Sequence, residues 1–356
     1  MLRVLRGRHP FLRILAPLLL AGVVASLLSG LHFPVAWLVG PLLAGVFYAV
    51  ILGVSAPLPS RWMTIAKSVV GLIAASRFVP EDLIRVSVYL IPVLIAIGMT
   101  GGLCMFNGYL IWRFSKIDLA TCLLGSIPGT ATAVVAISAE FGADPGSVAI
   151  LQYLRMTLVI VIVPIVASFF ATDAPIVPPS MSAQNAHPFP LAWDLMLIAI
   201  AIAGGTLLGE KGKLPTGGFL GTFLVGLLLF WVFSGQLAIP GGLSLAALLV
   251  IGLSAGLKFN LNTMRKLRKA VLLEVLLVVL LIVSCLCVGY GFHWLTQIDL
   301  ATALLAFAPG GLEAMVATSN QLGSDTGLVL IIMFLRQLVI ITSVAGLRHR
   351  LFHKIP

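Results

Sequence analysis

Residues 117–160 read IDLATCLLGSIPGTATAVVAISAEFGADPGSVAILQYLRMTLVI, and residues 298–341 read IDLATALLAFAPGGLEAMVATSNQLGSDTGLVLIIMFLRQLVII. Aligned without a gap, these stretches are identical at 21 of 44 positions. The spacing from Ile117 to Ile298 is the same for every matched pair, and we call it the repeat offset. Several of the identical residues are polar, so a shared preference for apolar residues does not explain the match. The chain is therefore predicted to hold two copies of one structural unit.

The repeat offset also holds toward the amino terminus of each copy. Pro34 and Gly45 correspond in this way to Pro215 and Gly226. Each copy contains six apolar segments, which in the first copy span residues 11–29, 34–53, 63–77, 86–112, 118–140 and 146–170. We expect one membrane repeat over residues 1–175, a proline-rich, solvated linker over residues 176–190, and a second membrane repeat over residues 191–356.

The composition predicts a protein that lies in a lipid bilayer. Of its 356 residues, 60% are hydrophobic and only 10% are charged, and the mean hydropathy is +1.13. Most apolar segments approach the roughly 20 residues that a helix needs to cross the hydrocarbon core. The predicted fold class is therefore an all-α polytopic membrane protein. The net charge of +10 does not indicate nucleic-acid binding, because the basic residues lie in short breaks between apolar runs.

Neither a cleaved signal peptide nor a metalloenzyme is predicted. The first apolar segment follows a basic start, as in a signal peptide, but it corresponds to an internal segment of the second copy and is expected to stay in the fold. The six histidines lie in loops, at segment ends or in the tails, without the paired helical spacing of metal sites. We therefore expect no metal, no cofactor and no enzymatic activity.

The distribution of lysine and arginine favours two repeats of opposite orientation. The fifth segment of each copy contains Pro128-Gly129 or Pro309-Gly310; if it enters and leaves on one side of the membrane, 18 of the 22 basic residues fall on the cytoplasmic side. If it crosses fully, 11 fall there. Segment 63–77, which is short and carries a lysine, is the alternative candidate for the segment that does not cross. We expect two inverted repeats with about ten crossing helices, two broken or re-entrant segments, and both termini in the cytoplasm.

The Pro-Gly pairs are predicted to interrupt a helix within the membrane. Proline lacks a backbone donor, so the break leaves carbonyl and amide groups that must face protein or water. In transporters such half-helices build ion and substrate sites near the middle of the bilayer. A kink satisfied by a neighbouring helix is the alternative for any single break, but the duplication favours one central site. The predicted substrate-binding residues at the breaks are Ser126, Pro128, Gly129, Thr130, Thr132, Pro309, Gly310 and Gly311.

An arginine is predicted deep in the sixth segment of each copy. If Asp144 and Asp325 cap these helices, Arg155 and Arg336 lie eleven residues further along, roughly 16 Å into the membrane. An arginine at that depth costs about 2.5–3.5 kcal/mol on insertion scales and needs a partner or an aqueous cavity. Three roles stay open: an anion-binding or gating pair, a structural ion pair or cap on the carbonyls of the break, and a side chain that reaches to the interface. Both arginines are included among the candidate substrate-binding residues.

Glu313 is the predicted coupling residue. It lies four residues after Pro309, where the first copy has Thr132, so the two copies differ at this point. A carboxyl group in an apolar site holds its proton more tightly, which suits proton coupling. A salt bridge to one of the two arginines is the alternative. Glu140 is expected to cap a helix at the interface, and Glu274 has no ionisable counterpart in the first copy and no assigned role.

These blocks resemble the bacterial membrane AbrB family. The resemblance rests on GSIPGTATAVVA (125–136) with GAD (142–144) and QYLR (152–155), and on APGGLEAM (308–315) with GSD (323–325) and FLR (334–336). It covers nearly the whole chain and implies a duplicated membrane module. Members of the family are labelled regulators of gene expression or ammonia monooxygenases, and the family is grouped, by remote similarity, with cation/proton antiporter and anion transporter folds.

The residues favour transport over the two family labels. An oxygenase would need a metal cluster, for which the intramembrane segments offer no suitable histidines, and direct DNA binding would need a basic soluble module, which no loop is long enough to form. We therefore expect a secondary transporter of the bacterial inner membrane that carries a small anionic solute, with proton coupling through Glu313. The alternative is a membrane-embedded sensor that regulates gene expression without net transport. The expected partners are the lipid bilayer and an unidentified small solute, without direct contact to nucleic acid.

Overall fold

The computed structural model shows an all-helical protein. It describes residues 10–51, 58–128, 131–171, 191–212, 214, 216–232, 239–259 and 268–352, and these residues form α-helices and one short 3-10 helix, without a strand. In the first half of the chain the elements are α1 (Pro10–Gly30), α2 (Ala36–Ile51), α3 (Ser60–Arg77), α4 (Pro80–Val88), α5 (Leu90–Phe114), α6 (Leu119–Ser126), α7 (Ala131–Ser138), η1 (Ala139–Phe141) and α8 (Pro145–Ser168). In the second half they are α9 (Leu191–Lys211), α10 (Gly217–Val232), α11 (Gly241–Leu257), α13 (Arg268–Thr296), α14 (Leu300–Phe307), α15 (Leu312–Leu322) and α16 (Thr326–Phe352).

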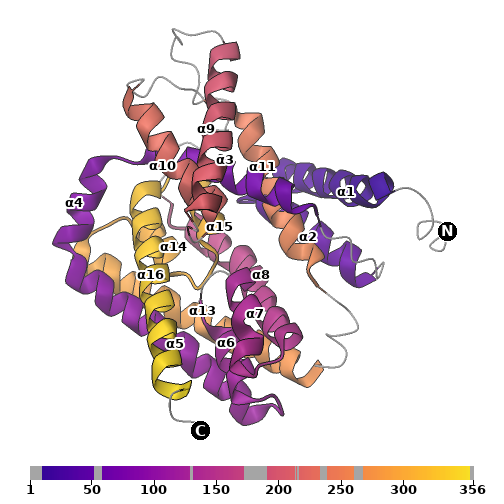
Figure 1. Cartoon of the computed structure of the whole chain (residues 1–356), viewed down its shortest axis with the longest axis vertical. Helices are drawn as coiled ribbons and strands as arrows, with labels where there is room; N and C mark the ends of the chain where they lie inside the picture. The colour runs from indigo at the N-terminus through magenta and orange to yellow at the C-terminus, as the bar shows by residue number, and fades with distance from the viewer. Residues whose placement is uncertain are drawn as a thin grey trace.

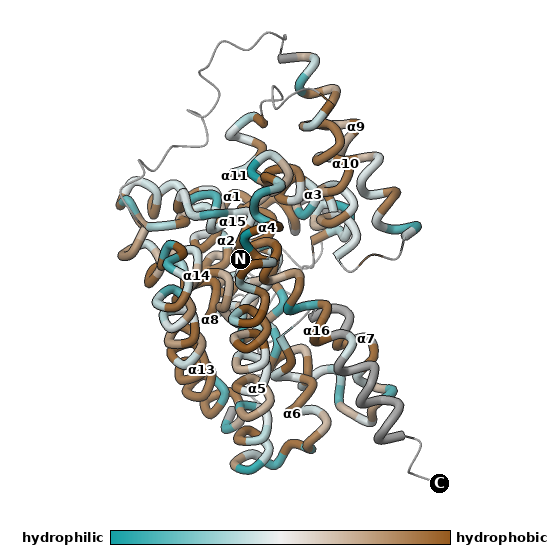
Figure 2. Tube along the Cα trace, turned by 90° about the vertical axis from the view of Figure 1, so that its left-hand side faces the viewer, coloured by the Kyte–Doolittle hydropathy of each residue, from teal (hydrophilic) through white to brown (hydrophobic). Residues whose placement is uncertain are grey.

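Several of these helices are long and apolar enough to cross a bilayer. Among the described residues these are four, α5, α8, α9 and α13, or five if α3 and α4, which are bent by 81° from one another, form one broken span. The apolar stretches of α1, α2, α10, α11 and α16 are shorter. The hydropathy-coloured tube of Figure 2 shows apolar residues along nearly every helix. The protein is therefore a multi-pass membrane protein, while ten crossings and inverted repeats stay predictions that helix length does not establish.

Helix α13 shows how the chain separates lipid-facing positions from buried ones. Leu272, Leu276 and Leu280 follow one another at intervals of about one turn and are exposed. Val278 and Ile282, on the other side of the helix, are buried. An apolar residue that is exposed at every turn is suited to contact lipid, so α13 has one face toward the bilayer and one toward the protein.

Helix boundaries recur at the repeat offset found in the sequence. Helix α14 begins and ends at the residues that match the two ends of α6, and the first residue of α16 matches that of α8. Both Pro-Gly pairs interrupt a helix, as predicted: α6 ends at Ser126 and α7 begins at Ala131, while α14 ends at Phe307 and α15 begins at Leu312. We call the residues between α6 and α7 the first break and those between α14 and α15 the second break. The last carbonyl groups of α6 and α14 have no following helical turn to donate to them, so they need other donors.

Aspartate caps connect each broken helix to the long helix that follows it. The Asp118 carboxylate accepts a hydrogen bond from the Thr121 amide at 2.7 Å, and the Asp144 carboxylate accepts one from the Ser147 amide at 2.9 Å. The Asp144 amide in turn donates to the Thr121 hydroxyl at 2.9 Å, which joins the start of α6 to the start of α8. The same contacts recur in the second half with Asp299, Thr302, Asp325 and Leu328. The predicted capping by Asp144 and Asp325 is confirmed.

The helices form two groups, which Figure 1 shows in the upper and lower halves of the molecule. The first helix group contains α1 to α3 and α9 to α11, with α2 packed on α11 and α10 packed on α3. The second helix group contains α5 to α8 and α13 to α16, with α5 packed along α13. Contacts between the groups run mainly from α3 and α11 to α15, α16 and α8.

Two glycines permit the close helix crossings of the first helix group. A Cβ atom on Gly71 of α3 would lie 2.3 Å from the carbonyl oxygen of Phe219 on α10, and one on Gly252 of α11 would lie 2.2 Å from that of Leu38 on α2. Larger residues would push these helices apart, since real Cβ atoms do not approach carbonyl oxygens so closely. The repeat offset relates Gly71 to Gly252 and Leu38 to Phe219, so the two crossings are copies of one contact.

Helix α4 connects the two helix groups. Its Arg85 guanidinium lies 3.3 Å from the carboxylate of Asp325, which caps α16. The buried Asp82 carboxylate lies against Gly327 in the first turn of α16. This helix is not predicted from the sequence, because most of it falls in the hydrophilic gap between two apolar segments. The structure therefore contains an attachment between the end of α3 and the start of α16 that hydropathy alone does not indicate.

Candidate functional site

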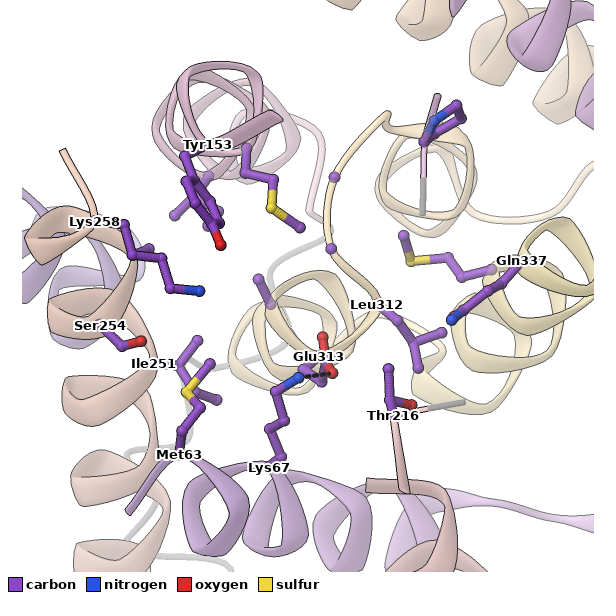
Figure 3. Close-up of a pocket in the computed structure, with 18 of the residues that line it drawn as sticks. Met63, Lys67, Tyr153, Thr216, Ile251, Ser254, Lys258, Leu312, Glu313 and Gln337 are labelled. Carbon is purple, nitrogen blue, oxygen red and sulfur yellow. Dashed lines mark ion pairs between the residues drawn. The ribbon is translucent and has the colours of Figure 1, made fainter. Parts of the chain in front are cut away.

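A pocket lies where the two breaks approach each other, between the first and second helix groups (Figure 3). Pro128 of the first break and Gly310 and Gly311 of the second break line it. The rest of its wall comes mainly from α3, α8, α11, α15 and α16. Both interrupted helices therefore reach one cavity, although the second break contributes more of the wall than the first.

The charged lining of the pocket is predominantly basic. Lys67 comes from α3, Lys258 directly follows the last residue of α11, and Arg336 comes from α16. Glu313, in the first turn of α15, is the acidic residue of the lining. With three cations against one carboxylate, the pocket has an excess of two positive charges when all four groups are ionised. Within the described residues, no group of three or more His, Cys, Asp or Glu side chains could hold a metal ion.

Lys67 and Glu313 form an ion pair across the boundary between the helix groups. The Lys67 Nζ atom lies 2.8 Å from Glu313 Oε1, and the two side chains are 20% and 12% exposed. Figure 3 shows the lysine reaching from α3 to the start of α15. The alternative considered for Glu313 was a salt bridge to an arginine; the salt bridge exists, but the partner is Lys67. Each charge of this largely shielded pair depends on the other, because removing one would leave the second poorly compensated.

Lys258 has a different environment from Lys67. Its ammonium nitrogen lies 4.4 Å from the centre of the Tyr153 ring on α8, a cation–π contact. Lys258 is exposed, and in the part of the chain that the structure describes it has no carboxylate within ion-pair distance. Its side chain points into the pocket beside Tyr153 (Figure 3). The ammonium group of Lys258 is therefore accessible to an anionic ligand.

Much of the remaining wall is apolar and flexible. Met63, Met156 and Met333 line it together with Ile160 and Ile251. Unbranched thioether side chains adapt to differently shaped partners at little cost. The pocket thus combines a basic polar lining with an apolar wall that tolerates variation in the shape of a ligand.

The start of α15 adds to the positive character of the pocket. Gly311 occupies the N-cap position and has no side chain to cap the helix. Gly311, Leu312, Glu313 and Ala314 all line the pocket, so the first turn of the helix faces the cavity. The free backbone N–H groups and the dipole of a helix amino terminus favour negative charge.

Arg155 caps the first break from within the second helix group. Its guanidinium donates hydrogen bonds to the carbonyl oxygens of Ser126 and Ile127, the latter at 3.0 Å, and to the side-chain oxygen of Gln152 at 2.8 Å. The residue is 1% exposed and does not line the pocket. Among the roles left open for this arginine, the contacts are those of the cap on the carbonyls of the break.

Arg336 caps the second break and also reaches the pocket. It donates to the carbonyl oxygens of Ala308 at 2.6 Å and Gly310 at 3.2 Å. Unlike Arg155, it belongs to the lining of the cavity. The two arginines, which look equivalent in the sequence, therefore share one structural contact but differ in their access to a ligand.

The predicted substrate-binding residues fall into three sets. The residues that line the pocket are Pro128, Gly310, Gly311, Glu313 and Arg336. Those that the structure describes outside the lining are Ser126, Arg155 and Pro309. Gly129, Thr130 and the side chain of Thr132 lie outside the described residues. Among the described residues, the second break thus contributes more residues to the pocket lining than the first.

Sequence reasoning missed Lys67, Lys258 and Tyr153 as pocket residues. Lys67 lies within apolar segment 63–77, and Lys258 ends the corresponding segment of the second copy. In the sequence both lysines indicate only the orientation of the segments in the membrane. A lysine inside an apolar segment is a signal in itself, because it needs a partner. What the sequence did not reveal is that α3 and α11 pack beside the second break.

Comparisons with known proteins agree over most of the chain. The family model described as transition state regulatory protein AbrB matches residues 37–352. The chain is 30% identical over 326 residues to the protein of Escherichia coli (strain K12) named "Putative regulator AbrB", covering 88% of this chain and 90% of the relative. It is 26% identical over 349 residues to the Bacillus subtilis (strain 168) protein named "Uncharacterized protein YhjN", covering 92% of this chain and 90% of the relative. The family match thus spans both halves of the chain and both breaks, and the chain belongs to the membrane AbrB family.

Proposed function

We propose that the protein is a secondary transporter that carries a small organic anion across the bacterial inner membrane through the pocket between the two helix groups. The observation that carries this proposal is the charge of the pocket, where Lys67, Lys258 and Arg336 outnumber Glu313. Charge-assisted hydrogen bonds are the strong ones, and their strength increases where water is scarce. A small anion is the ligand class that such a lining favours.

The three cations are not equally free to bind a ligand. Lys67 is paired with Glu313, and two guanidinium nitrogens of Arg336 donate hydrogen bonds to backbone carbonyls. Among the described residues, the Lys258 ammonium group contacts the Tyr153 ring and forms no ion pair. Lys258 is therefore the first contact of the anion in this proposal, with the start of α15 as a second source of donors.

The ion pair supplies a mechanism for proton coupling. An anionic group of the substrate replaces the Glu313 carboxylate opposite Lys67 when Glu313 takes up a proton and loses its charge. Proton binding and anion binding then favour each other, and this reciprocity is what links the two in a symporter. In this proposal Glu313 is therefore the residue that couples proton binding to anion binding.

The apolar wall supports an organic substrate over a bare inorganic ion. Met63, Met156 and Met333 offer a surface on which an inorganic anion would gain nothing, whereas the hydrocarbon part of a carboxylic acid would be removed from water there. The ligand class is thus a small carboxylate or a related organic anion with an apolar portion.

The position of the pocket suits alternating access. Sites of secondary transporters lie at interrupted helices, between parts of the protein that move against each other. This pocket lies at two interrupted helices and between two helix groups. In the proposal the repeats are inverted, about ten helices cross the membrane and both termini are cytoplasmic.

A membrane-embedded sensor is the second candidate function. It is favoured by the name of the Escherichia coli relative, "Putative regulator AbrB". In that case the same pocket binds a small anion, and the bound state changes gene expression through a partner without net movement of the ligand.

Binding and flux separate these candidates. Purified protein is screened for thermal stabilisation by a panel of small carboxylates, and the best ligand is tested for uptake into liposomes under proton and sodium gradients. We expect Lys258→Gln to weaken binding about tenfold, or roughly 1.4 kcal/mol. Lys116→Gln is the matched control, since Lys116 is exposed and lies outside the pocket.

Three results decide between the outcomes. Binding with uptake supports the transporter. Binding without uptake under either gradient refutes it and leaves the sensor. Unchanged affinity in Lys258→Gln refutes the assignment of this pocket as the anion site.

A further inference from the structure

A buried carboxyl group outside the pocket plays no part in the proposed transport. Glu274 on α13 is 0% exposed, and neither of its oxygens has a hydrogen bond of normal geometry. The side-chain amide of Asn107 on α5 lies beside it, and the amide nitrogen also lacks a normal hydrogen bond. Two buried polar groups therefore face each other where α5 packs along α13, and their contact falls short of normal hydrogen-bond geometry.

Helix α6 ends, and the first break begins, close to this pair. The hydroxyl group of Ser126 and the Nε atom of Arg155 are buried there without a hydrogen-bond partner. The Ser126 Cβ atom lies close to Gly108, the residue that follows Asn107 on α5. Arg155 is the cation whose charge attracts the Glu274 carboxylate. Its two terminal nitrogens, however, donate hydrogen bonds to the carbonyls of the break and to Gln152.

The matching place in the other half of the molecule is apolar. The repeat offset takes Glu274 to Val93, Asn107 to Val288 and Ser126 to Phe307. Val93 and Phe307 are fully buried, and Val288 packs against the same apolar core. The equivalent helix contact is therefore filled by hydrocarbon around Arg336, so the scaffold does not require the polar set that surrounds Arg155.

An ionised Glu274 would be poorly compensated in its observed surroundings. A carboxylate that is removed from water without donors carries a large desolvation cost, and such a group binds a proton in preference to staying charged. We infer that Glu274 is a membrane-embedded proton-binding site, separate from the pocket, and that it holds its proton in the conformation described here. The proton comes from water, bonds to one carboxylate oxygen, and returns to water on release.

Loss of this proton changes the contacts of Arg155. The charged carboxylate then attracts the guanidinium and competes with the carbonyls of Ser126 and Ile127 for it. The cap on the first break is thereby weakened in favour of an ion pair inside the second helix group. Proton binding at Glu274 thus controls the local structure of a break that lines the pocket through Pro128.

The groups that face Glu274 set the pH dependence of this site. Arg155 faces it from α8, Asn107 and the Cys104 thiol from α5, and the Cys122 thiol from α6. Arg155 is the charged member of this set and opposes protonation, whereas burial favours it. The Asn107 amide also favours the ionised form, but neither carboxylate oxygen has a hydrogen bond of normal geometry, so burial decides the balance in favour of the protonated form. The inference holds whether the protein transports its ligand or only senses it.

Infrared difference spectra test the inference directly. The spectrum of the wild-type protein minus that of Glu274→Gln, in lipid nanodiscs at neutral pH, should contain the C=O stretch of a protonated carboxyl group. This band should disappear at alkaline pH and persist in Glu313→Gln. A difference spectrum with only ionised carboxylate bands at neutral pH would overturn the inference.

Stability provides the second measurement. Glutamine resembles the protonated side chain, so Glu274→Gln should unfold near the wild-type temperature at acidic pH, below the ordinary glutamate pKa of about 4.3. Wild type should become the less stable of the two as the pH rises from there toward the point at which the folded carboxyl group ionises, because over this range the unfolded chain releases a proton that the folded chain keeps. Glu274→Val, which copies the other half of the molecule, serves as a second reference for both measurements. Failure of both variants to fold would show that the fold needs the charge, and parallel pH profiles would show that no proton is bound; either result overturns the inference.

Discussion

The ammonium nitrogen of Lys67 on α3 lies 2.8 Å from a carboxylate oxygen of Glu313 on α15. This contact joins the first helix group to the second at the pocket, and the two side chains are 20% and 12% exposed. Neither charge can be removed alone without leaving the other in a poorly solvated place. The two residues therefore act as one unit in folding and, under the proposed function, in ligand binding.

A double-mutant cycle on this pair should show strong coupling. Lys67→Met leaves the Glu313 carboxylate unpaired, Glu313→Gln leaves the Lys67 ammonium unpaired, and the double variant should recover part of both losses. We expect a coupling free energy of about 1–3 kcal/mol from unfolding of the purified protein in detergent. Strictly additive losses would show that the contact contributes nothing to stability.

The glycine crossings of the first helix group should tolerate no side chain. Gly71→Ala and Gly252→Ala each place a Cβ atom 2.3 Å or 2.2 Å from a carbonyl oxygen, and each should cost about 1–3 kcal/mol. Gly98→Ala is the control, since nothing lies within 4 Å of its Cβ position and alanine favours the helix. Thermal unfolding of the three variants measures the difference. Equal midpoints would mean that the two crossings can open without cost.

Replacing Arg155 should affect the fold more than the ligand. Arg155→Gln removes the cap on Ser126 and Ile127, and hydrogen bonds from a charged donor are worth about 1.5–3 kcal/mol each, so we expect a clear drop in the unfolding temperature. Arg336→Gln should also weaken anion binding, because Arg336 lines the pocket. Unfolding and ligand titration on both variants provide the comparison. A stable Arg155→Gln protein that no longer binds the anion would contradict the capping role.

Lys116 and Gln297 test the inverted arrangement. They precede α6 and α14 at positions related by the repeat offset, and both are exposed. Inverted repeats place Lys116 on the cytoplasmic side and Gln297 on the opposite side. A cysteine at each position, in a protein whose exposed Cys287 is replaced, is labelled with a membrane-impermeant maleimide in intact cells and in inside-out vesicles. Labelling of both positions from one side would rule out the inversion.

Local features of the fold can be predicted from the sequence because their causes are local. Pro128 and Pro309 interrupt a helix since proline lacks the amide hydrogen that the next turn needs. Asp144 and Asp325 cap α8 and α16 since an aspartate at that position accepts from the amide three residues on. In each case the deciding atoms lie within a few residues of each other.

The pocket was only partly predictable because its walls meet through long-range packing. Glu313 stood out through its place beside the second break, but its partner Lys67 is brought there by the crossings of α3 with α10 and α15. Arg155 and Arg336 occupy matching positions in the two copies, yet only Arg336 reaches the cavity. Their contacts with carbonyls follow from the duplicated module, whereas access to the cavity depends on which helices surround each copy.

Under the proposed function, the bend between α3 and α4 limits how far the two helix groups can move relative to each other. Helix α4 holds the start of α16 through Arg85 and Asp325, so a second helix group that slides past the first must pull α4 along. The corner at Phe78 and Val79 is then the hinge, and α4, nine residues or roughly 13 Å long, is the lever arm that swings from it. In the proposed transporter, the length of α4 would then limit how far the start of α16 moves from the end of α3 while the Arg85–Asp325 contact stays intact.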